Sequence, residues 1–268
     1  MFSLAAEVIA EWAYPFSAFV ERPGRVNSVS VKTTIRVAAA GDVHAVEPLR
    51  ERLERAFSAI AEDSDLVLLA GDLTTHGLPE QAAVLADACG SLDTPIVAVL
   101  GNHDHHSNLC AEVTSALEDG GVIVLDRGHT ILEIGEVEVG IVGTKGFVGG
   151  FPGAEIADFG EPALRHVYQE TTLEVDALER GLEEIAGCHK RIVLLHYAPV
   201  EDTLVGEPER IWAFLGSGRL AGPIGAHRPD LVVHGHAHHG APRGSIGEVP
   251  VHNVAVHVTG QDFAVFDI

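Results

Sequence analysis

Short apolar runs alternate with helical patterns over the first half of the chain. Residues 35–40, 66–70 and 95–100 are mainly Val, Leu, Ile and Ala, and a glycine follows each run. The helical patterns between and after them cover residues 48–62, 80–88 and 107–118. Strands that alternate with helices predict βαβ units and a parallel sheet, and strands that are apolar throughout predict a sheet covered on both faces.

The second half of the chain predicts further strands and one long helix. Gly-containing turns separate three closely spaced strands, which indicates a hairpin or meander. A helix is predicted at residues 162–185, whereas residues 199–228 are rich in loop residues and receive no assignment. The predicted strands are residues 122–125, 130–134, 137–142, 192–195, 231–233, 251–256 and 263–266.

The first 33 residues differ from the rest. Residues 4–20 are largely apolar, but Glu7 and Glu11 interrupt them and no basic region precedes them. This pattern disfavours a signal peptide and is too short and charged for a transmembrane span. We therefore predict an N-terminal extension over residues 1–33, formed by a helix that packs on the main domain at residues 34–268 or on a partner, with a disordered extension as the alternative. An oligomer formed through this segment is one consequence of the helical interpretation.

Composition restricts the partners. The 268 residues carry 39 acidic and 17 basic side chains, for a net charge of -22, which disfavours long nucleic acids and anionic membranes. The charge argues less against a small phosphoester, because bound divalent metals reverse the local sign. Three widely separated cysteines without a CxxC motif indicate reduced thiols and predict a cytoplasmic protein.

Polar residues with metal-binding chemistry follow five of the apolar strands. Because ligands of open α/β sheets bind at the carboxyl ends of strands, these residues are expected to converge on one crevice. Imidazoles and carboxylates without cysteine suit Mn, Fe, Zn or Co rather than Ca. The residues at the five strand ends are Asp42 and His44; Asp72; Asn102, His103 and Asp104; His196; and His234, His236 and His238.

Two metal ions account for this set better than one. Seven of the residues are candidate ligands, more than one ion needs, so two ions that share a bridging carboxylate are expected. The spacing of Asp42 with His44 and of His236 with His238 points both members of a pair the same way in extended backbone. Turn residues at the strand ends and a core position for His196 are the alternatives.

The pattern leaves more than one interpretation open for other histidines near these blocks. His234 is either a group behind the ligands or a histidine that faces the sheet. His105 and His106 either line a substrate cleft or lie in a solvated loop. His76 lies close enough to Asp72 in sequence to flank the site.

The ordered blocks Asp-x-His, Gly-Asp, Gly-Asn-His-Asp, a single histidine and Gly-His-x-His resemble the calcineurin-like metallophosphoesterase family over residues 35–257. The resemblance implies an α/β fold, a four-layer α/β/β/α sandwich of two mixed sheets flanked by helices. It implies two divalent or mixed-valence ions of Mn, Fe or Zn that share Asp72. The first ion would take Asp42, His44, Asp72 and His238, and the second Asp72, Asn102, His196 and His236.

The same resemblance implies a mechanism. Two metals lower the pKa of a bridging water, and the resulting hydroxide attacks phosphorus. His103 resembles the proton donor or transition-state stabiliser at the leaving oxygen, and Asp104 is expected to orient its imidazole. These expectations make the chain a hydrolase of a small-molecule phosphoester.

Details of the blocks favour one branch of the family. The form Gly-Asp-Leu-Thr resembles bacterial phosphodiesterases, although Thr75 replaces the Asp or Asn common in relatives. A phosphomonoesterase acting on a small molecule or a protein is the alternative. Asp104 and the absent Asp-Arg-Gly disfavour a protein Ser/Thr phosphatase, and the lack of a basic track disfavours a nuclease. Retention of His103 disfavours a non-catalytic scaffold of the same fold.

Overall fold

The computed structural model describes residues 34–90 and 92–268, so the helix predicted within residues 1–33 lies outside the described residues. The strands are β1 (Arg36–Ala40), β2 (Leu66–Ala70), β3 (Ile96–Val99), β4 (Val122–Val124), β5 (Gly128–Ile134), β6 (Val137–Thr144), β7 (Lys190–Leu195), β8 (Leu231–His234), β9 (Arg243–Ile246), β10 (Val249–Asn253) and β11 (Ala264–Asp267). The α-helices are α2 (Arg50–Ala61), α3 (Pro79–Cys89), α4 (Cys110–Asp119), α5 (Pro162–Glu184), α6 (Trp212–Leu215), α7 (Ala221–His227) and α8 (Val256–Thr259). Short 3-10 helices are η1 (Glu47–Leu49), η2 (His103–His105), η3 (Glu201–Leu204), η4 (Glu209–Ile211) and η5 (Gly218–Leu220).

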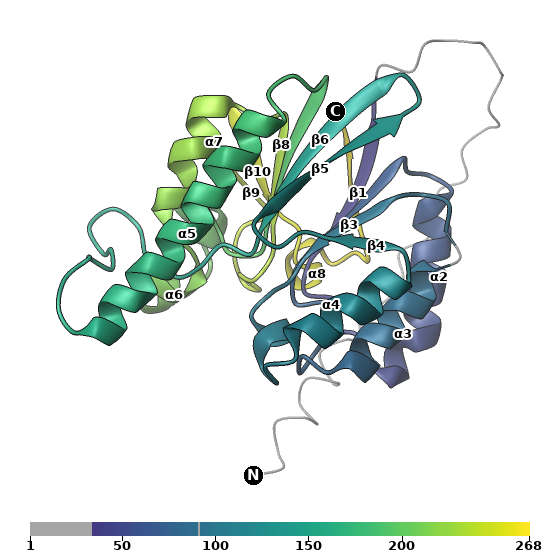
Figure 1. Ribbon diagram of the computed structural model, residues 1–268, viewed down its shortest axis with the longest axis horizontal. Coiled ribbons are helices and arrows are strands. Elements are labelled where there is room, and N and C mark those ends of the chain that lie inside the picture. The colour runs from purple at the N-terminus through teal and green to yellow at the C-terminus, as the bar shows by residue number, and fades with distance from the viewer. Residues whose placement is uncertain (1–33, 91) are drawn as a thin grey trace. The chain divides into compact units, whose positions relative to one another are not determined.

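The strands form two mixed sheets (Figure 1). The five-stranded sheet has the order β11-β1-β2-β3-β4, in which β1 to β4 are parallel and β11 is antiparallel. The six-stranded sheet has the order β5-β6-β7-β8-β10-β9, in which the four central strands are parallel and the two edge strands are antiparallel.

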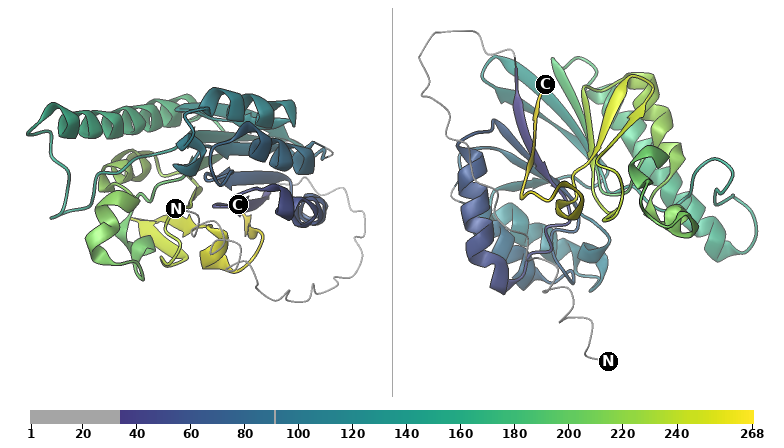
Figure 2. Two further views of the ribbon diagram at one scale, coloured as in Figure 1. Left: turned by 90° about the horizontal axis from the view of Figure 1, so that it is seen from below. Right: turned by 180° about the vertical axis from the view of Figure 1, so that it is seen from behind.

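Alternating side chains explain the layers. In β1, Val37 and Ala39 join the apolar core between the two sheets, whereas Ala38 and Ala40 pack in the core beneath α2, α3 and α4. A third core lies between the second sheet and the helices α5 and α7. Figure 2 shows α2, α3 and α4 on the outer face of one sheet and α5 and α7 on the outer face of the other. The predicted four-layer α/β/β/α sandwich is confirmed.

The predicted and observed secondary structure differ mainly in the C-terminal half of the chain. The strand predicted at residues 251–256 ends at Asn253, and residues 256–259 form α8 instead. The edge strand β9 was not predicted, because Ile246 is its only large apolar residue and gives no alternating pattern. Residues 199–228 contain η3, η4, α6, η5 and α7, all too short for a helical period to show.

Main-chain hydrogen bonds join the loops that follow the parallel strands. The Asp42 amide donates to the Gly71 carbonyl at 2.9 Å, and the His44 amide donates to the Asp72 carbonyl at 3.0 Å. In the second sheet, the Gly235 amide donates to the His196 carbonyl at 3.1 Å. These bonds hold the candidate site at the carboxyl ends of both sheets. Across the described range, none of the helices has the length and apolar character needed to cross a membrane.

Candidate metal centre

The side chains from the five strand ends meet in two groups that share Asp72. Within each group the ligand atoms lie within 4.8 Å of one another. Asn102 joins the second group, because its Oδ1 lies 2.9 Å from His196 Nε2. All seven residues expected to bind metal are therefore brought together. The first group is Asp42, His44, Asp72 and His238, and the second is Asp72, His196 and His236.

Four of these residues adopt left-handed backbone conformations. The φ angles are 60° at Asp42, 46° at His44, 50° at Asp72 and 69° at His236. A positive φ is uncommon outside glycine and costs conformational energy, so surrounding contacts must enforce it. In the described part of the chain, four of the seven non-glycine residues with a positive φ lie where these side chains converge, and such a grouping is typical of a functional site.

Two glycines allow the close approach of these loops. A Cβ atom on Gly101 would overlap with the amide nitrogen and Oδ1 of Asp72. A Cβ atom on Gly235 would overlap with Oδ2 of Asp42. Any side chain at either position would therefore displace a carboxylate of the centre.

The tautomer of His196 leaves a lone pair that faces two oxygens. Its Nδ1 lies 2.9 Å from the Ala70 carbonyl oxygen, which can only accept, so Nδ1 carries the proton. Burial lowers the pKa of this fully buried imidazole well below its ordinary value, and the ring is neutral. The unprotonated Nε2 lies 3.3 Å from Asp72 Oδ1 and 2.9 Å from Asn102 Oδ1. Three electron-pair donors thus converge without a proton between them, the arrangement that a cation completes.

Two other imidazoles are neutral for the same reason. Burial lowers the pKa of His236 to about 4 and that of His44 to about 3. His236 Nε2 lies 3.2 Å from the Phe214 carbonyl oxygen, so Nε2 carries the proton and Nδ1 is free to bind a metal. These rings supply lone pairs rather than positive charge.

The two buried carboxylates of the centre have pKa values shifted in opposite directions. Asp42 and Asp72 are 0% and 1% exposed. Burial raises the pKa of Asp72, and so do the charges of Asp42 and Asp104, while the His103 amide and the charge of Lys145 oppose the shift. Burial also acts to raise the pKa of Asp42, but His238, whose Nε2 lies 2.9 Å from Oδ1, together with His196 and His44 outweighs burial and holds that pKa below its usual range. Imidazole and carboxylate donors without thiolate fit the predicted transition metals.

Asp104 does not have the predicted role. Its carboxylate accepts hydrogen bonds from the amides of Leu73, Thr74 and Gly101 at 2.8–3.1 Å and from the Thr74 hydroxyl at 2.6 Å. Burial raises its pKa, and these four donors oppose that shift. The expectation that Asp104 orients the His103 imidazole is wrong, because its oxygens are used to tie together the loops after β2 and β3.

His103 is oriented by main chain instead. Its Nδ1 lies 2.9 Å from the Thr75 carbonyl oxygen, and its Nε2 lies 3.9 Å from Asp72 Oδ2. The Thr75 hydroxyl donates to the His44 carbonyl at 2.9 Å, so Thr75 links a candidate ligand to His103. The sequence carried no signal for this contact, since a carbonyl oxygen is present at every residue.

Three further residues at the centre were not predicted. The His257 ring of α8 stacks on His238 with centroids 4.4 Å apart, because the Val256 amide donates to the Gly41 carbonyl and brings α8 to the loop after β1. The Tyr197 ring lies 4.4 Å from that of His236. Lys145 follows β6, and its carbonyl accepts from the amides of His196 and Tyr197.

The remaining candidate histidines lie outside both groups of ligands. His234 is fully buried, with its ring nitrogens at 2.8 Å from the Gly235 carbonyl oxygen and 2.9 Å from the Thr203 hydroxyl. His106 packs its ring 4.3 Å from that of His103. His105 contacts Cys110 through Nδ1, and His76 contacts Gln81 at the surface.

Comparison with known proteins agrees with the fold. The structure is similar to phosphopantetheinyl hydrolase from Mycobacterium tuberculosis (TM-score 0.56, 13% identity, 82% of this chain and 88% of that chain). It is also similar to a putative 5'-nucleotidase from Staphylococcus aureus (TM-score 0.56, 17% identity, 87% and 53%). A third neighbour is GAP50, the anchor in the inner membrane complex of Plasmodium (TM-score 0.53, 11% identity, 84% and 72%). These identities show the shared fold alone.

A search of curated proteins finds no match. The model of the calcineurin-like phosphoesterase family, in contrast, matches residues 35–240, which contain all seven candidate ligands. The chain therefore belongs to the calcineurin-like phosphoesterase family.

Proposed function

We propose that this protein is a metal-dependent hydrolase of a phosphodiester. The observation that carries the proposal is the pair of ligand groups that share Asp72 and lie beside His103. We assign one ion to Asp42, His44, Asp72 and His238, and a second ion to Asp72, Asn102, His196 and His236. When bound, two such ions supply a nucleophile from water near neutral pH and neutralise charge on the phosphoryl oxygens.

Residues of the chain would hold the two ions and position the substrate beside them. Asp72 is the bridging carboxylate, and the His103 amide donates to its Oδ1 at 2.8 Å, which fixes the carboxylate plane. We assign His103 Nε2 as the donor of a proton, or of a stabilising hydrogen bond, to the leaving oxygen. Its side chain is 33% exposed, so a substrate can reach it. Asp104 is a positioning residue for the two loops.

The choice of a diester rests on the Gly-Asp-Leu-Thr segment at residues 71–74, which resembles the phosphodiesterase branch. A monoesterase would use the same centre, so the reaction must be measured. The neighbours include an enzyme named as a hydrolase and a protein named as an anchor, and a non-catalytic role is therefore a second outcome of the same experiment.

The test is a panel of substrates with protein loaded with Mn. It compares bis(p-nitrophenyl) phosphate, p-nitrophenyl phosphate and cyclic nucleotides, with Asp72→Ala as the matched inactive protein. We expect the highest kcat/KM of the wild-type protein for a diester, and no hydrolysis of any ester by the variant. A higher kcat/KM for the monoester would assign a phosphomonoesterase, and no turnover of any ester at full metal content would assign the scaffold. We expect a cytoplasmic location and a small-molecule substrate rather than nucleic acid, consistent with the net charge of -22.

A further inference from the structure

A basic side chain lies at a sixth strand end, beside the ligands. β6 runs parallel to β7, and their last paired residues are Thr144 and Leu195. The next residues in this register are Lys145 on one strand and the candidate ligand His196 on the other. The amides of His196 and Tyr197 both donate to the Lys145 carbonyl, at 3.1 and 3.0 Å. The backbone of Lys145 is thus held against the metal centre.

Alternation along β6 and β7 places the Lys145 side chain on the same face as His196. Ile141 and Leu194 lie in the core between the sheets, whereas Val142 and Leu195 lie in the core beneath α5. Because successive side chains point to opposite faces, Lys145 and His196 both belong to the face between the sheets, where the ligands converge.

A buried glutamate of α5 fixes the residues on either side of Lys145. Glu174 is 2% exposed, and its Oε2 accepts from the Thr144 hydroxyl and from the Gly146 amide. Its Oε1 accepts from Arg127 at 2.9 Å. Arg127 therefore neutralises Glu174, and no oxygen of this carboxylate lies within ion-pair distance of Lys145.

The ammonium group of Lys145 retains hydrogen-bonding capacity. An ammonium has three donors, and within the described part of the chain Nζ has one acceptor, the neighbouring Gly146 carbonyl at 3.2 Å. No carboxylate among these residues forms an ion pair with it. Nζ also lies over the rings of Phe147 and Tyr197, with centroids 4.4 and 5.2 Å away. The rings hold the cation in place and leave its remaining N–H groups for an anion.

We propose that Lys145 is a substrate-binding residue whose ammonium binds a non-bridging phosphoryl oxygen beside the metal centre. The inference rests on the proposed phosphoester hydrolase function and adds a determinant of specificity to it. A phosphomonoester carries up to two negative charges and a diester carries one, so the Lys145 charge stabilises the bound monoester more strongly. Lys145 thereby raises the affinity of the enzyme for a monoester relative to a diester.

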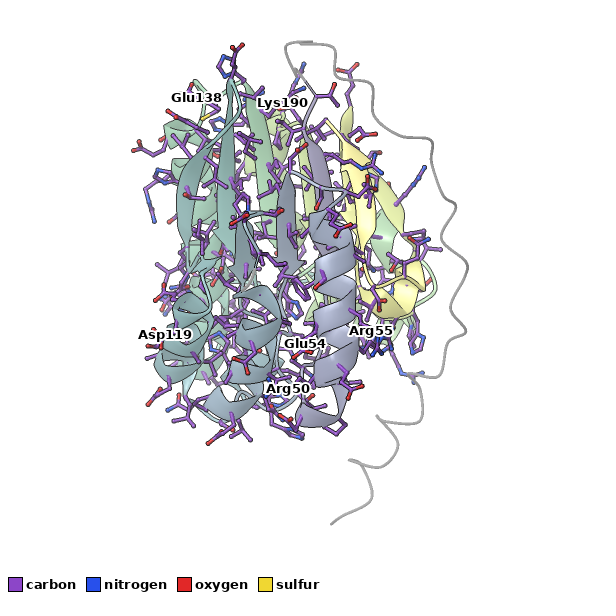
Figure 3. All side chains as sticks on the ribbon, turned by 90° about the vertical axis from the view of Figure 1, so that its right-hand side faces the viewer. Arg50, Glu54, Arg55, Asp119, Glu138 and Lys190 are labelled. Atoms are coloured by element: carbon purple, nitrogen blue, oxygen red, sulfur yellow. The ribbon has the colours of Figure 1, made fainter. Side chains whose placement is uncertain are left out.

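The experiment compares Lys145→Met with Lys145→Arg in the metal-loaded protein. Lys190→Met is the matched control, since it removes the same charge at the opposite end of β7. Figure 3 shows Lys190 and Glu138 at that end, away from Arg50 and Asp119. For each protein we measure the Kd for inorganic phosphate by calorimetry, the metal content, the melting temperature, and kcat/KM for p-nitrophenyl phosphate and its bis ester.

We expect Lys145→Met to keep its metals and to weaken phosphate binding by about 10–100-fold, the range for a hydrogen bond to a charged group. The loss in kcat/KM should be larger for the monoester than for the diester. Lys145→Arg should retain most of the phosphate affinity, and Lys190→Met should match the wild type.

Unchanged phosphate affinity in metal-replete Lys145→Met would overturn the inference, as would an equal loss in Lys190→Met. Loss of metal from the variant would also overturn it, because Lys145 would then support the ligands rather than the substrate. Should Lys145→Met not fold, phosphate affinity in Lys145→Arg below one hundredth of wild type would count against the inference. A wild-type protein that binds phosphate through Lys145 but hydrolyses neither ester would refute the proposed function and leave this inference standing.

Discussion

His103 Nδ1 lies 2.9 Å from the carbonyl oxygen of Thr75, and this contact determines what His103 can do. Because the carbonyl only accepts, Nδ1 carries a proton and Nε2 is the ring nitrogen left to face a substrate in the proposed role. The Thr75 hydroxyl donates in turn to the His44 carbonyl, so the position of the imidazole is fixed relative to the candidate ligands. Replacement of the Thr75 side chain would leave the carbonyl in place, which makes His103 itself the residue to change.

His103→Ala should retain both metals and lose about 10²–10⁴-fold in kcat, the range for general acid catalysis. The loss should be smaller for a nitrophenolate leaving group, which needs little protonation, than for an alkoxide. Kinetics on the two ester types, with metal content by elemental analysis, check this. The control is His129→Ala on the exposed face of β5. Equal losses on both esters would instead assign His103 to charge stabilisation, and loss of metal would make it a ligand.

Asp72→Ala should lose both ions, whereas His44→Ala should lose mainly one. Only Asp72 belongs to both ligand groups, and a terminal ligand affects a single site. We expect excess Mn to restore part of the activity of His44→Ala but none of that of Asp72→Ala. Metal titration followed by calorimetry gives the stoichiometry of each variant. The bridging assignment fails if the same Mn concentration restores both.

Wild-type protein purified without chelator should contain close to two transition-metal equivalents. Removal of the metals should lower the melting temperature, because it leaves the buried carboxylates Asp42 and Asp72 close together without the cations that would stabilise both. A ligand at 100 times its Kd stabilises by about 2.7 kcal/mol, which corresponds to roughly 5–10 °C in a domain of this size. Calorimetric melting with and without chelator measures the shift, and saturation at one equivalent would contradict the dinuclear centre.

Asp104→Asn should lower the free energy of unfolding by about 2–4 kcal/mol, since an amide nitrogen would face the main-chain amides that now donate to a buried carboxylate. Urea denaturation measures this change, and Asp119→Asn at the exposed end of α4 is the control. Stability equal to wild type, combined with a selective loss on poor leaving groups, would restore the role for Asp104 that its contacts contradict.

The sequence was sufficient to locate the buried parallel strands β1, β2 and β3 of the five-stranded sheet. Each of β1, β2 and β3 is buried on both faces, and such strands appear as apolar runs that periodicity and flanking glycines delimit. β9 and the helices α6 to α8 were not predicted, because elements of four to seven residues are too short to show a hydrophobic period. Their positions depend on tertiary contacts. The side chains with ligand chemistry were found because the strand ends present them in recognisable blocks.

The amino-acid sequence specifies which residue types end each strand, and therefore the family and the seven candidate ligands. Which atoms face one another depends on how the strands and loops pack. The Thr75 carbonyl holds His103, the Asp104 carboxylate turns to main-chain amides, and Lys145 and His257 join the centre from β6 and α8. Main-chain acceptors and cross-strand neighbours cannot be predicted from residue type. They arise from strand register and from the packing of α8 against the loop after β1.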